Sequence, residues 1–75
     1  MPEDARRAQL EAELRDAEKR VAQGERDIWR LAGVFAKLQR LGIVDDATTK
    51  ALDALRRSQA LFVDERDRLR RALGR

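Results

Sequence analysis

Two series of apolar residues, each repeating every seven positions, dominate this chain and are interrupted only once. The first half carries Leu14, Val21, Ile28 and Phe35 in one series and Leu10, Ala17, Gly24, Leu31 and Leu38 in the other. These are the a and d rows of a helix that packs along a second helix. The interruption is QRLGIVDDATTK, residues 39–50, where Gly42 suits a C-cap and Asp45 or Asp46 suits an N-cap. The pattern predicts an all-α protein of two helices joined by a short loop.

We expect a single antiparallel two-helix hairpin over residues 1–75, with helix 1 at about 2–41, a loop at 42–46 and helix 2 at about 47–73. The matching rows of helix 2 are Thr48, Leu55, Phe62 and Leu69, with Ala51, Ser58, Glu65 and Ala72 beside them. If the chain folds back about Ile43, Gly24 faces Phe62 and accommodates its ring. About the first dozen residues of helix 1 then have no partner in the same chain.

The chain is too short to bury a large core by itself. Its 75 residues, 43% apolar and 41% charged, fit one small domain that is marginally stable without a second chain. Cys and His are absent, which excludes disulfides and leaves Ser58, the single serine, without a histidine to activate it. We therefore expect a non-catalytic protein with no cofactor and no metal site.

No part of the sequence resembles a membrane span or a signal peptide. No apolar run approaches the roughly 18 residues that a transmembrane helix needs. The N-terminal MPEDARRAQL contains acids and no apolar segment. We expect a cytoplasmic protein that does not bind membranes.

Apolar residues outside the two rows indicate a second packing surface. Trp29 and Val34 lie on opposite sides of helix 1, and Leu61 lies outside the rows of helix 2. One pair of helices does not cover so wide an apolar arc, so we expect two hairpins to dimerise into a four-helix bundle. The predicted dimer or partner interface comprises Leu10, Leu14, Trp29, Val34 and Leu61. This predicts a protein-protein interaction module with a regulatory or adaptor role toward an unidentified protein. A half-exposed packing position at the hairpin edge is the simpler explanation for Trp29.

Most of the charge is expected to be neutralised along the helices. Seven acid-base pairs fall at i, i+4 with the acid first: Glu3 and Arg7, Glu11 and Arg15, Asp16 and Arg20, Asp46 and Lys50, Asp53 and Arg57, Asp64 and Arg68, and Asp67 and Arg71. The net charge of +3 arises within residues 26–44, where Arg26, Arg30, Lys37 and Arg40 oppose Asp27 alone. A solvated face explains this excess most simply.

Two alternative functions use the same surfaces. A hairpin dimer that binds RNA or DNA would use Arg26, Arg30, Lys37 and Arg40. This function is less favoured because no aromatic residues interleave with these basic residues as stacking surfaces. A DNA-binding helix-turn-helix is disfavoured because both helices are too long and Asp45 and Asp46 open the second. A small inhibitor protein from a mobile element would use the same surfaces, so the sequence does not distinguish it from an adaptor.

Three sequence stretches resemble a set of short helical-hairpin proteins of alphaproteobacteria whose function is unassigned. Val21, Ala22, Gly24, Glu25 and Arg26 match a Val-Ala-x-Gly-Glu-Arg stretch, Leu38 and Gly42 match its Leu-x-x-x-Gly loop, and Arg66, Asp67, Arg68 and Leu69 match its C-terminal run. Glu65 stands in place of an Asp, and the loop GIVDD is more apolar than in the set. The resemblance covers about residues 17–74 and implies a helical hairpin, without implying an activity.

Overall fold

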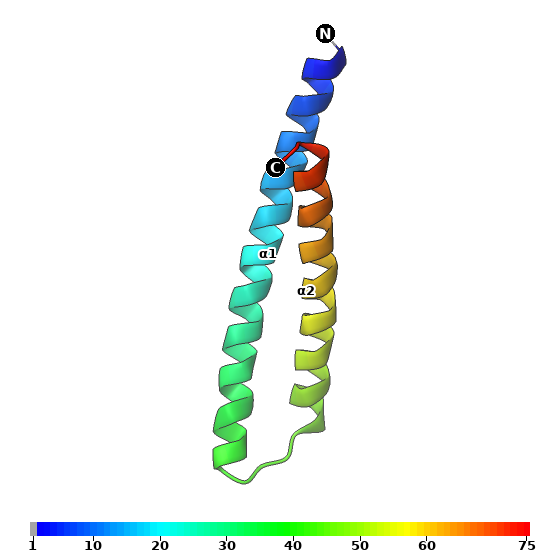
Figure 1. Ribbon diagram of the computed structural model, residues 1–75. Helices are drawn as coiled ribbons and strands as arrows, with labels where there is room; N and C mark the ends of the chain where they lie inside the picture. Colours follow the sequence, from blue (N-terminus) through cyan, green and yellow to red (C-terminus); the bar gives the residue numbers. More distant parts are fainter. Residues whose placement is uncertain (1) are drawn as a thin grey trace.

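The computed structural model describes residues 2–75 and shows two long helices that run antiparallel (Figure 1). Helix α1 spans Pro2–Arg40 and helix α2 spans Asp46–Ala72. The molecule is a rod of 61 × 16 × 14 Å, in which the N-terminal end of α1 extends past the end of α2. The predicted all-α hairpin is confirmed.

Gly42 ends α1 and turns the chain toward α2. Its φ of +74° lies in the left-handed region, which glycine adopts readily because it has no Cβ. The Gly42 N–H donates to the Gln39 carbonyl at 3.0 Å, and the Ile43 N–H donates to the Leu38 carbonyl at 2.9 Å. These two bonds form a Schellman motif and satisfy carbonyls at the end of α1.

Asp45 caps the N-terminus of α2. Its Oδ1 accepts a hydrogen bond from the Ala47 N–H at 3.0 Å, and its Oδ2 accepts one from the Thr48 hydroxyl at 2.6 Å. Hydrogen bonds from the side chain and backbone of Thr48 hold the pKa of Asp45 below its ordinary value of 3.8. Folding therefore favours the ionised form of the Asp45 carboxyl group over its protonated form.

Asp45→Ala is expected to lower the melting temperature at pH 7, because the Ala47 N–H and the Thr48 hydroxyl lose their acceptor. Since the folded pKa of Asp45 is depressed, its ionised form stabilises the hairpin above about pH 4, and this contribution is lost as pH falls through the folded pKa. Circular dichroism melts at pH 7 and about pH 2.5 test this. Asp45→Asn is the control, because the amide retains an acceptor that does not titrate. A penalty for Asp45→Ala that is equally large at both pH values would contradict the assignment.

The buried cluster of the hairpin lies at the end farthest from the loop. Leu14, Ala17, Leu69 and Leu73 form one buried cluster, and Leu10 packs against it. Val21 and Leu52 are also buried. Because a fully buried leucine contributes roughly 1.5–3 kcal/mol, this cluster is the main source of stability within one chain.

One predicted row of α2 is wrong by one residue. Ala51, Ser58 and Ala72 are exposed and Glu65 is half-buried, whereas their neighbours in sequence occupy the contact with α1. The row in the structure is Leu52, Gln59, Arg66 and Leu73, all buried or half-buried. The physical reason is size, since turning Leu52 and Leu73 inward buries more apolar area than turning Ala51 and Ala72 inward. This rotation leaves alanines on the surface of α2.

Gly24 faces Gln59 rather than Phe62, so that predicted pairing is also wrong. A Cβ placed on Gly24 would overlap the Oε1 atom of Gln59. The Gln59 amide instead reaches over Gly24 and donates through Nε2 to the Val21 carbonyl at 2.8 Å. The missing side chain at Gly24 therefore makes room for a hydrogen bond between the helices.

The ion pairs of the structure differ from the predicted acid-first series. Glu11 binds Arg7 at 3.5 Å and Arg75 of the C-terminus at 3.4 Å, so it is engaged away from Arg15. Glu18 binds Arg70 across the hairpin at 3.3 Å. Glu65 is half-buried and accepts hydrogen bonds from Arg68, which lowers the pKa of Glu65. Such exposed pairs add little stability, but they determine which cations remain uncompensated.

Candidate functional site

Exposed apolar side chains concentrate toward the loop, away from the buried cluster. The large exposed ones are Trp29, Val34, Leu41, Ile43, Val44 and Leu61. Trp29 has 83% and Leu61 has 68% of its surface exposed. Single exposed apolar residues are common, but several along one half of a rod indicate a surface that another molecule can cover.

The segment from Leu10 to Leu14 is not the uncovered overhang that the sequence suggested. Leu14 is only 2% exposed, because Leu69 and Leu73 pack against it. Leu10 is half-buried against the same cluster, and Glu11 bonds to Arg75. The contact with α2 therefore begins near Leu10, earlier than predicted. Leu14 has almost no surface left to offer a partner.

Val34 and Leu61 lie on one side of the hairpin. On that side, Asp16 and Arg20 of α1 line a hollow together with Glu65 and Leu69 of α2. Val34 follows Asp16 by five full turns of 3.6 residues, and Leu61 precedes Glu65 by about one turn. Both side chains therefore point toward the side marked by this hollow.

Trp29 lies on the opposite side. It follows Glu11 by five full turns, and Glu11 and Glu18 bind Arg75 and Arg70 along that side. The helical geometry also separates Trp29 and Val34 by about 140° around α1. The structure thus does not bring the five predicted interface residues together on a single surface.

Small residues of α2 complete the side that carries Val34 and Leu61. Their spacing alternates between four and three positions, which keeps them in one row of the helix. The row consists of the exposed small residues Ala47, Ala51, Ala54 and Ser58 and ends at the larger Leu61, and we call these five residues the α2 small-residue row. The sequence places Leu61 beside Ala54 and Ala47, but its heptad pattern assigns Ala51 and Ser58 to the core. Short side chains let a second helix approach closely.

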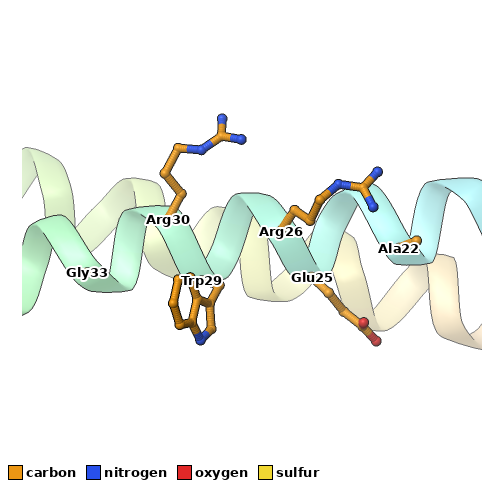
Figure 2. Close-up of a pocket in the computed structure, with 6 residues that line it drawn as sticks. All are labelled: Ala22, Glu25, Arg26, Trp29, Arg30 and Gly33. Carbon is orange, nitrogen blue, oxygen red and sulfur yellow. The ribbon is translucent and has the colours of Figure 1, made fainter.

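A shallow groove runs along α1 around Trp29. Its lining residues are Ala22, Glu25, Arg26, Trp29, Arg30 and Gly33. Figure 2 shows Trp29 and Glu25 along one edge of the helix and Arg26 and Arg30 along the other. No atom outside α1 lies within 4 Å of a Cβ placed on Gly33, so this end of the groove is open. An aromatic surface and two guanidinium groups are thus available to the same ligand.

The four predicted basic residues are all exposed. Arg26, Arg30, Lys37 and Arg40 form no ion pair within residues 2–75. Arg26 donates to the neutral Gln23 Oε1 at 2.9 Å, and Gln23 in turn donates to Asp27 at 2.9 Å. The expectation that no aromatic residue lies among these basic residues is wrong, because Trp29 lines the groove with Arg26 and Arg30.

Comparison with known proteins gives no relative from which a function could be transferred. No family model, no curated protein and no solved structure matches this chain. Within residues 2–75, neither helix is long and apolar enough to cross a membrane.

Proposed function

We propose that this chain is a non-catalytic protein-protein interaction module that acts as a homodimer of hairpins in a regulatory or adaptor role. The observation that supports this is the exposed apolar surface on the side of Val34 and Leu61. The α2 small-residue row allows a second hairpin to approach that side closely, and a four-helix bundle covers apolar surface that one pair of helices leaves in water.

Val34→Glu with Leu61→Glu is expected to convert the dimer to a monomer. Each substitution places a charge in an interface core, where an unpaired carboxylate is strongly unfavourable. Sedimentation equilibrium should give twice the chain mass of 8.6 kDa for the wild type and a single chain mass for the variant.

Trp29→Asp is the matched control, because Trp29 lies on the other side of α1 and its loss should leave the dimer intact. Dissociation by Trp29→Asp together with a stable dimer for the double variant would move the interface to the Trp29 side. A wild-type chain that stays monomeric at all concentrations would refute the homodimer.

The adaptor role is tested by capture from lysate of the source cells after nuclease treatment. A protein retained by the wild type and lost with the Val34→Glu, Leu61→Glu variant would support this role. A protein retained equally by both would not use the proposed surface.

A further inference from the structure

We propose that the outer face of α1 binds single-stranded nucleic acid through a line of six cations and Trp29. The cations are Arg15, Lys19, Arg26, Arg30, Lys37 and Arg40, all exposed. Successive members are four, seven, four, seven and three positions apart, spacings that keep them on one side of a helix. This side points away from α2, because Ala17 and Val21 are buried on the opposite side. We call the six residues the basic line.

The basic line is not neutralised within the hairpin. None of its members forms an ion pair among residues 2–75. Two acids beside the line pair elsewhere, Glu11 with Arg7 and Arg75 and Glu18 with Arg70. Three others, Asp16, Glu25 and Asp27, lie close to its members in sequence but form no ion pair with them among residues 2–75. From Arg15 to Arg40 the line extends about 37 Å at 1.5 Å per residue. A regular row of uncompensated cations of this length matches a polyanion.

Trp29 points to a nucleic acid with exposed bases. Its indole is 83% exposed and lines the same groove as Arg26 and Arg30, although it lies with Glu25 on the opposite edge of the helix (Figure 2). An unpaired base can stack on the indole while its flanking phosphates bind the guanidinium groups. In a duplex the bases are already stacked and not available to the ring. Adsorption to an anionic membrane would need several apolar side chains beside the cations, whereas here Trp29 is flanked by Ala22 and Gly33.

Intrinsic fluorescence gives a direct test, because Trp29 is the only tryptophan of the chain. Titration with an unlabelled homopolymeric strand of about 20 nucleotides should quench the Trp29 emission, and a duplex of equal length should quench it much less. If all six cations contact phosphates, the slope of log K against log salt should be roughly −4.

The placement of charge is tested at constant net charge. Lys19→Gln, Arg30→Gln and Lys37→Gln remove three charges from the basic line. Arg56→Gln, Arg57→Gln and Arg71→Gln remove three from exposed positions of α2, so both variants change the net charge from +3 to 0. At about 0.1 M salt each lost contact weakens single-strand binding roughly fivefold. We expect roughly 100-fold weaker binding for the basic-line variant and a change below about threefold for the α2 variant.

The aromatic contribution is measured by anisotropy with a labelled strand. Trp29→Ala should weaken binding about tenfold, and Trp29→Phe should restore part of that loss. Circular dichroism must show an unchanged helical signal for every variant compared.

Equal weakening by the two charge variants would overturn the proposal, because binding would then depend on net charge alone. Stronger binding to vesicles of anionic phospholipid, with a blue shift in place of quenching, would also overturn it. Val34 and Leu61 do not belong to the basic line. Binding to the single strand can therefore be measured separately from dimer formation in the Val34→Glu, Leu61→Glu variant.

Discussion

Leu69→Ala should destabilise the hairpin by about 3 kcal/mol, the largest effect that we expect from a single truncation. Leu69 is only 1% exposed and packs in the cluster that holds Leu14, Ala17 and Leu73 together. Shortening it removes apolar contact and leaves a cavity between two rigid helices, which have no neighbouring layer that could move in. In so small a domain this loss is a large fraction of the total stability. Urea unfolding followed at 222 nm measures it.

Leu41→Ala is the matched control for this prediction. The substitution is the same, but Leu41 is 65% exposed and follows the last residue of α1, so we expect a loss well below 1 kcal/mol. Both variants should be measured at low protein concentration, so that dimer formation does not contribute. Similar losses for the two would mean that the buried cluster does not dominate the stability of one chain.

Gly24→Leu should destabilise the hairpin by about 1–3 kcal/mol even though leucine is the better helix former. Any side chain at Gly24 displaces the Gln59 amide, which then loses its hydrogen bond to the Val21 carbonyl. A leucine also forces the helices apart at this level. Thermal melts followed by circular dichroism report the change.

Gly33→Leu separates this local effect from helix propensity. Nothing lies within 4 Å of a Cβ placed on Gly33, so leucine should be accommodated there and should stabilise α1 by up to about 1 kcal/mol. Opposite signs for the two glycines would support the contact between Gly24 and Gln59. A Gly24→Leu variant that melts at or above the wild-type temperature would refute it.

The hairpin could be predicted because its determinants are local. Rows of apolar residues indicate where the helices run, and Gly42 and Asp45 indicate where the chain turns. The rotation of α2 could not be obtained in the same way. Ala51 and Leu52 are separated by only about 100° around the helix, so the volume of the side chains at the contact decides which one is buried. That volume depends on both helices at once.

The candidate surfaces were predictable to different degrees. The spacing of Arg26, Trp29, Arg30 and Gly33 is visible in the sequence and predicts that they share one face of α1. The uncompensated state of Arg15 was not predictable. Glu11 is within reach of more than one arginine, and its pairing with Arg75 depends on where α2 ends. Ion pairing between distant segments requires the folded structure.

The Gln59 amide also helps to determine the alignment of the two helices along their length. Heptad rows look alike after a shift of seven residues, so leucines and alanines alone would permit the helices to slide past one another by a heptad. Such a shift would place Gln59 against Ala17 or Leu31, where a side chain occupies the space that Gly24 leaves empty. The amide would then be buried without its acceptor, at a cost of roughly 1–3 kcal/mol. One polar residue and one glycine thus favour a single alignment of the two helices over alignments shifted by seven residues. The residues on both exposed sides of the hairpin therefore keep fixed positions relative to one another.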